Sequence, residues 1–172
     1  MPASLVLKTI ELTADAPRKG FAVVTASTYD GRQGVQITDT ALPPVRFKRP
    51  RGEGWTYHFA GDGMLIHQWD DAPDVFGYTV FLTVTSKLDK ALEITGKAST
   101  AAGGLANSVG MQPVGAVLNA TDPILKAIAN MAGARLVGSL TGSERDESGT
   151  KQAWTLRRQE GEVVFTLTYS VS

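Results

Sequence analysis

The chain has 172 residues, of which 42% are hydrophobic and 20% charged, and its 17 basic and 17 acidic residues leave no net charge. This composition is typical of a globular domain, and the length suits one domain with a substantial core. Proteins that bind double-stranded nucleic acid usually need a net basic surface to neutralise phosphates, so that class is disfavoured. The absence of cysteine excludes disulfides, thiolate zinc sites, iron–sulfur clusters and thiol nucleophiles.

The N-terminal residues lack the basic stretch, long apolar run and small-residue cleavage site of a secretory signal. They read instead as a β-strand around Leu5–Leu12. No stretch approaches the roughly 18 consecutive apolar residues that suggest a transmembrane helix. We therefore expect a soluble, cytoplasmic protein, and the sequence leaves export without a cleaved signal open.

Turn signals divide the next part of the chain into hairpins. Asp30-Gly31 lies between two β-rich segments within residues 20–38. Asp62-Gly63 lies between Trp55–Phe59 and Met64–Trp69. Such pairs readily adopt the positive φ values of type I′ turns, which connect neighbouring antiparallel strands. The sequence therefore predicts two hairpins here.

Alternation of side chains is clearest in residues 75–85 and 163–171, which we predict to be strands with one buried face. A further strand is expected at 134–142, and the last strand should form a hairpin with residues 151–159 through a turn at Glu160-Gly161. The apolar side chains that share one face are Phe76, Tyr78, Val80, Leu82 and Val84 in the first segment and Val163, Phe165, Leu167, Tyr169 and Val171 in the second.

The alternation stops between residues 87 and 134. The segment 121–133 has the features of a helix: Thr121 or Asp122 as N-cap, a proline in the first turn and Gly133 at the end. Residues 86–98 are a second helix candidate. We expect the small, glycine-rich segment between them, residues 99–115, to be a loop.

About eight or nine strands, mostly joined as hairpins, predict a single, mainly β domain over residues 1–172. Its expected fold is an antiparallel β-sandwich with a helical, glycine-rich insertion at about residues 87–134, whose apolar side chains would cover an open end of the sandwich or form an association surface. The last hairpin resembles that of C2-type sandwiches through Trp154, Leu156 and Gly161. Because the paired aspartate-rich calcium loops of that family are missing, the resemblance implies neither calcium nor lipid binding.

The first candidate binding segment is PPVRFKRPRGEGW, residues 43–55. Cations interleaved with aromatic rings suit an anion, such as phosphate, an acidic protein surface, anionic lipid head groups or single-stranded nucleic acid. The alternative is a solvated connection between hairpins, with its aromatic rings turned into the core. The candidate anion- or partner-binding residues are Arg46, Phe47, Lys48, Arg49, Arg51 and Trp55.

The second candidate segment is HQWDDAPDVFGY, residues 67–78, which gathers carboxylates beside a histidine. If Asp62-Gly63 is a hairpin turn, the two histidines of the chain face each other and, with a carboxylate, begin a zinc site. The aspartates alone offer oxygen ligands to calcium, without EF-hand spacing. The alternative is a surface turn with paired surface histidines. The candidate metal ligands are His58, His67, Asp70, Asp71 and Asp74.

Motifs of nucleophilic catalysis and of phosphate-binding loops are missing from the sequence, which disfavours an enzyme. We predict a non-enzymatic binding or assembly module that acts through sheet edges, the insertion and the 43–55 segment. Edge strands and zero net charge favour self-association, including a role as a structural subunit of a larger particle. The alternatives are a ligand-binding sandwich that recognises an anionic surface or a metal through its loops, and a hydrolase with two carboxylates.

Overall fold

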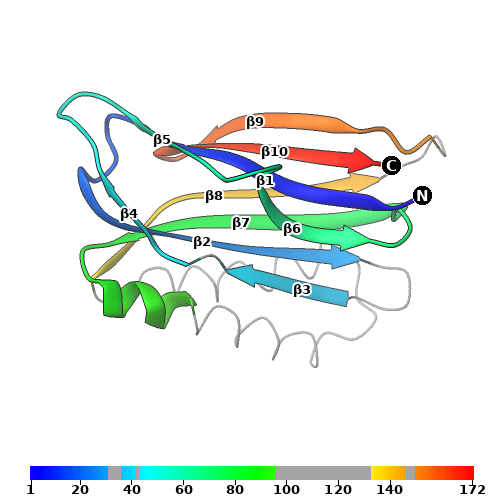
Figure 1. Ribbon diagram of the computed structural model, residues 1–172, viewed down its shortest axis with the longest axis horizontal. Coiled ribbons are helices and arrows are strands. Elements are labelled where there is room, and N and C mark those ends of the chain that lie inside the picture. Colours follow the sequence, from blue (N-terminus) through cyan, green and yellow to red (C-terminus); the bar gives the residue numbers. More distant parts are fainter. Residues whose placement is uncertain (31–35, 42, 96–132, 146–149) are drawn as a thin grey trace.

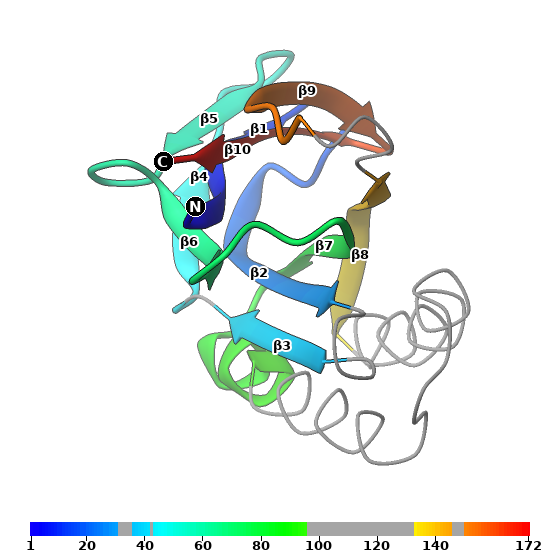
Figure 2. The same ribbon diagram turned by 90° about the vertical axis from the view of Figure 1, so that its right-hand side faces the viewer.

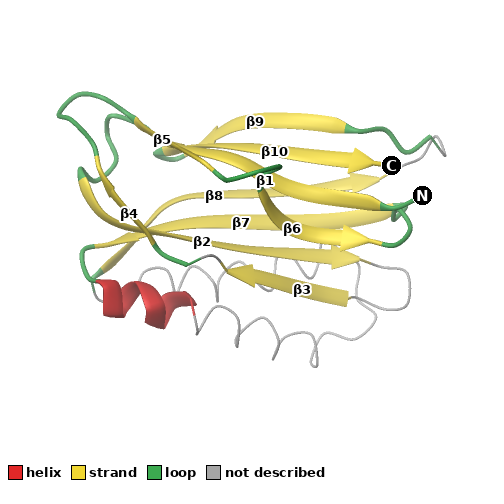
Figure 3. Ribbon diagram, in the orientation of Figure 1, coloured by secondary structure: helices red, strands yellow, loops and turns green. Residues whose placement is uncertain are grey.

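A computed structural model describes residues 1–30, 36–41, 43–95, 133–145 and 150–172 (Figure 1). Two antiparallel sheets pack face to face (Figure 3), which confirms the predicted mainly β, sandwich-like architecture. The strands are β1 (Ala3–Leu12), β2 (Lys19–Asp30), β3 (Gln36–Ala41), β4 (Val45–Lys48), β5 (Trp55–His58), β6 (Met64–Trp69), β7 (Val75–Thr85), β8 (Ala134–Arg145), β9 (Trp154–Glu160) and β10 (Val163–Val171).

The first sheet has the strand order β5-β1-β10-β9, and β6 also pairs with β1. The pairing of β1 with β10 runs from Ala3–Val171 to Leu12–Val163, so the two termini lie at one end of the sandwich, which faces the viewer in Figure 2. Glu160 pairs with Val163, which confirms the predicted last hairpin. Its turn contains Gly161, with a φ of 63°.

The predicted hairpin at Asp62-Gly63 is wrong. His58 of β5 pairs with Thr9, and His67 of β6 pairs with Leu5, so the two strands lie end to end along the same edge of β1. The pairing of β1 with β10 shifts register between Leu7 and Thr9, at the point where the other edge of β1 changes partner from β6 to β5. The local turn signal failed because both segments find a partner in β1 instead of in each other.

The second sheet has the order β3-β2-β7-β8, and β4 also pairs with β2. The hairpin of β2 and β3 is confirmed, but Asp30 pairs with Gln36, so residues 31–35 connect the strands in place of a two-residue turn. Strand β4 adds to the expected number of strands. It lies in the 43–55 segment and pairs with the first residues of β2.

The insertion between β7 and β8 begins with a helix over residues 88–95, as predicted for the 86–98 segment. Its Ala91 and Ile94 pack against Val23 on the outer face of β2. This helix (red in Figure 3) therefore covers an outer sheet face instead of an open end of the sandwich. The helix expected at 121–133 and the loop expected at 99–115 lie outside the described residues.

The core lies between the sheets and contains the apolar faces predicted for β7 and β10. β7 differs from its prediction because its other face is buried as well. Phe81 is 1% exposed and packs against Leu136 of β8, and Thr83 is 2% exposed. A strand buried on both faces is typical of the middle of a covered sheet. The end of the core near the termini is filled by the aromatic rings of Trp69, Phe76, Tyr78, Trp154 and Tyr169.

Candidate functional site

The basic segment 43–55 forms the edge strand β4, the loop after it and the first residue of β5. Because side chains alternate along a strand, Phe47 points into the core and is 4% exposed, whereas Arg46 and Lys48 point outward. Trp55 packs against Phe47, with ring centroids 5.2 Å apart. The two aromatic residues thus belong to the core, as the alternative interpretation of this segment expected.

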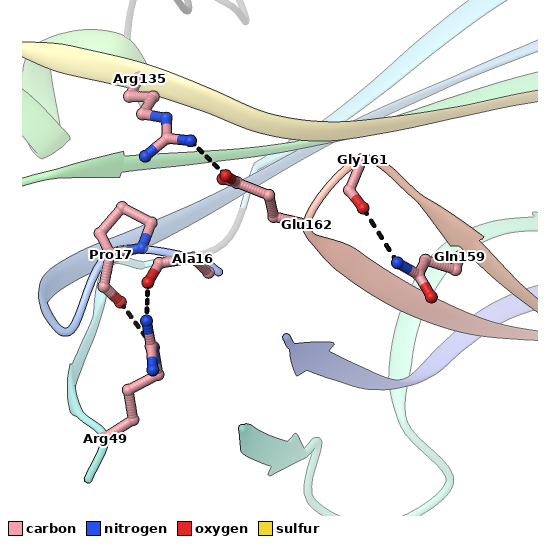
Figure 4. A network of polar contacts seen from close by, with 7 residues as sticks. All are labelled: Ala16, Pro17, Arg49, Arg135, Gln159, Gly161 and Glu162. Atoms are coloured by element: carbon pink, nitrogen blue, oxygen red, sulfur yellow. Dashed lines mark hydrogen bonds and ion pairs between the residues drawn. The ribbon is translucent and has the colours of Figure 1, made fainter. Parts of the chain in front are cut away.

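Arg49 is buried, with 4% of its surface exposed, although the sequence grouped it with the other cations. Its Nε donates to the carbonyl oxygen of Pro17 at 3.1 Å, and Nη2 donates to that of Ala16 (Figure 4). Nη1 donates to the carbonyl oxygen of Glu53 at 2.9 Å. The guanidinium therefore holds the loop before β2 against the loop before β5. Because its N–H groups are bonded to these carbonyl oxygens, the buried Arg49 guanidinium is not accessible to an external anion.

Three exposed cations lie together on the outer face of the second sheet, and we call Lys19, Arg46 and Lys48 the cationic patch. Lys19 of β2 pairs directly with Lys48 of β4, and Arg46 pairs with Phe21. Directly opposed side chains have Cβ atoms about 5 Å apart, so two like charges there repel each other. Within the described ranges, none of the three cations forms an ion pair.

Two other cations at this end of the sandwich, Arg135 and Arg158, have carboxylate partners. Arg135 pairs with Glu162, as Figure 4 shows. Arg158 Nε lies 2.6 Å from Glu160 Oε1. The cationic patch has no acidic partner among the residues that the structure describes, and the same holds for Arg18 and Arg51 in the neighbouring loops.

The loops beside the patch carry charges of both signs. Arg18 and Arg51 are exposed, and so are Asp15 and Glu53 on the same two loops. The charges of these four residues cancel, so the two loops add little net charge beside the patch. The excess of positive charge comes from the strands β2 and β4, which hold their side chains more firmly than loops do.

The two histidines do not form the expected pair. His58 is exposed on β5, whereas His67 is half-buried on β6 and packs edge-on against Trp69, with ring centroids 4.6 Å apart. Burial lowers the pKa of His67, and the charge of Asp30 opposes this shift. His67 therefore behaves as part of the aromatic packing at the edge of the first sheet.

The aspartates of the second candidate segment have other partners. The Asp71 carboxylate lies 2.9 Å from the N-terminal ammonium group, and that of Asp74 lies 3.1 Å from Lys151 Nζ. Asp70 is exposed beside them. Among the described residues, no three histidine, aspartate or glutamate side chains are arranged to hold a metal ion. The structure thus does not bring the five predicted ligands together.

Sequence reasoning missed Lys19, because this residue lies far from the 43–55 segment along the chain. Its exposure follows from the alternation of β2, but its position opposite Lys48 depends on the pairing of β2 with β4. Strand pairing between distant segments has no local sequence signal.

The sequence matches no protein-family model, and a search of curated proteins finds no similar sequence. No helix within the described ranges is long and apolar enough to cross a lipid bilayer.

Proposed function

We propose that this protein is a non-enzymatic binding module that contacts an anionic partner through the cationic patch. The observation that carries the proposal is the direct pairing of Lys19 with Lys48, without an acidic partner in the part of the chain that the structure describes. Opposed like charges destabilise a strand pair, so folding gains nothing from them. A partner with closely spaced negative charges would relieve the repulsion and be attracted over a longer range.

The support under the patch favours a site that is ordered before binding. Phe47 anchors β4 in the core between the outward-pointing Arg46 and Lys48. Arg49, which follows Lys48, fixes the end of the strand through its hydrogen bonds to backbone carbonyl oxygens. A rigid arrangement loses less conformational entropy on binding. The patch lies on an exposed strand surface, which suits an extended anionic surface better than a small ion.

Self-association remains a prediction. The edge strand β4 is short and has prolines close to both ends, Pro44 and Pro50. The edge strand β9 carries Arg157 and Arg158. Short, charged and proline-flanked edges are typical of strands protected from pairing with another chain. These edges favour a partner bound through side chains over a partner bound by strand addition.

The proposal predicts that neutralising the cationic patch weakens binding to anionic surfaces. In low-salt buffer the wild-type protein should bind vesicles that contain phosphatidylserine, or polyglutamate, and the affinity should fall as salt is added. The two probes distinguish a lipid surface from an acidic polypeptide. The variant K19Q/R46Q/K48Q should bind the preferred probe at least about tenfold more weakly, which corresponds to about 1.4 kcal/mol.

The matched control is R135Q/R157Q/R158Q, which removes the same number of positive charges. Each of these arginines has a carboxylate partner: Glu162, Glu11 and Glu160 respectively. This control should keep most of the affinity. Equal losses in both variants would show attraction to net charge alone, and failure of the wild type to bind either probe would contradict the proposal.

A further inference from the structure

An open pocket of about 240 Å³ lies at the end of the sandwich opposite the cationic patch, where both chain termini are found. The start of β7, the end of β8, the start of β9 and the end of β10 contribute to its lining. The lining residues that decide its chemistry are Asp74, Phe76, Glu144, Lys151, Trp154 and Tyr169.

Aromatic rings form one side of the pocket. Trp154 stacks on Tyr169, with ring centroids 5.7 Å apart, and Phe76 lies 5.1 Å from Tyr169. Phe76 and Tyr169 are almost fully buried, whereas Trp154 is half-buried and offers part of its ring to the pocket. The face of an indole ring is electron-rich and attracts cations more strongly than the other aromatic side chains do.

Glu144 supplies a negative charge beside these rings. It pairs in register with Phe76 and shares the inward face of β8 with the buried Leu140. In the described part of the chain its carboxylate forms neither a hydrogen bond nor an ion pair. A half-buried carboxylate without a partner is costly to keep charged, and burial accordingly raises its pKa.

The other charged residues that line the pocket are Asp74, Lys151 and Arg145. Asp74 is paired with Lys151, and Lys151 Nζ also donates to the carbonyl oxygen of Ala72. Arg145 follows Glu144 on β8 and also lines the pocket, but the two side chains form no ion pair with each other. The pocket therefore has one carboxylate, that of Glu144, without an ion-pair partner among the described residues, and the indole ring of Trp154 lines the same pocket.

We propose that this pocket binds a small organic cation, an ammonium group, with Glu144 as the countercharge and Trp154 as the aromatic wall. The inference is independent of the proposed function, since the pocket and the cationic patch lie at opposite ends. Attraction to the indole face and to the carboxylate acts in the same direction on a cation. An anion would be repelled by both the indole face and the carboxylate. A neutral ligand would gain no electrostatic attraction from either group.

The test uses choline and its uncharged carbon isostere 3,3-dimethylbutan-1-ol, followed by tryptophan fluorescence of the full chain. Choline should produce a saturable change, and the isostere should bind at least about tenfold more weakly, because only choline gains the cation–π and carboxylate attractions. E144Q should weaken choline binding about tenfold, and W154L should weaken it similarly and remove most of the signal. The control E53Q, at the other end of the molecule, should leave the affinity unchanged.

The pH dependence provides a second readout. Of the titratable groups near Glu144, Tyr78 has its pKa raised to about 12 by burial and by the Glu144 charge, so it is neutral at neutral pH. Arg145 and the Asp74–Lys151 pair are the other charged groups of the pocket. Only the charged form of Glu144 attracts choline. Choline affinity should therefore be highest above the raised pKa of Glu144 and should be lost as the pH falls through that pKa. The E144Q variant should show no such pH dependence. Equal affinity for choline and the isostere, no saturable binding of choline, or E144Q binding like the wild type would overturn the proposal.

Discussion

Replacing Arg49 with methionine is expected to lower the free energy of unfolding by about 3 kcal/mol, measured by urea denaturation. Methionine fills similar space but donates no hydrogen bond, so the carbonyl oxygens of Ala16, Pro17 and Glu53 lose a charged donor. R49K should restore only part of the loss, because an ammonium group lacks the planar fork that reaches carbonyls from two loops.

The control for this prediction is R51M, which changes an exposed arginine two residues further along the same loop. It should alter the free energy of unfolding by less than about 0.5 kcal/mol. If R49M were as stable as R51M, Arg49 would not be the connection between the two loops, and its assignment as an anion ligand would have to be reconsidered.

Replacing Gly138 with alanine should also destabilise the protein by about 3 kcal/mol. A Cβ atom at this position would overlap Val163 Cγ1 and the carbonyl oxygen of Glu160. Here β8 of the second sheet meets the β9–β10 turn of the first, and the Glu162 N–H donates to the carbonyl oxygen of Val137 at 2.9 Å. The added methyl group would push the two sheets apart where they are hydrogen-bonded.

The matched control is S139A, one residue further along β8, where the side chain is half-buried. It should change the free energy of unfolding by less than about 1 kcal/mol. Comparable stability of G138A and S139A in urea denaturation would mean that the sheets do not approach each other closely at Gly138.

Features that depend on neighbouring residues were predictable from the sequence. The alternation in β7 and β10 identified the inward faces correctly, and the turn at Gly161 was visible from the flanking strands. Features that depend on distant partners were not. The edge of β1 decides the pairing of β5 and β6, and the burial of the second face of β7 involves Leu136 of β8.

The candidate site divides in the same way. The clustering of charge in the 43–55 segment is a property of the sequence, and Arg46, Lys48 and Arg51 are exposed in the structure. The use of Arg49 as a structural clamp depends on carbonyl groups contributed by another loop, more than 30 positions earlier in the chain. The sequence alone therefore indicates where the charge is but not which cations are available to a partner.

The substitution K48E tests most directly whether the pairing of Lys19 with Lys48 serves binding instead of folding. An attractive pair would replace a repulsive one, so the free energy of unfolding should rise by about 0.5 kcal/mol. The affinity for the preferred anionic probe should fall at least about tenfold in the same variant. A variant that is less stable than the wild type and still binds the probe with undiminished affinity would contradict the role assigned to the cationic patch.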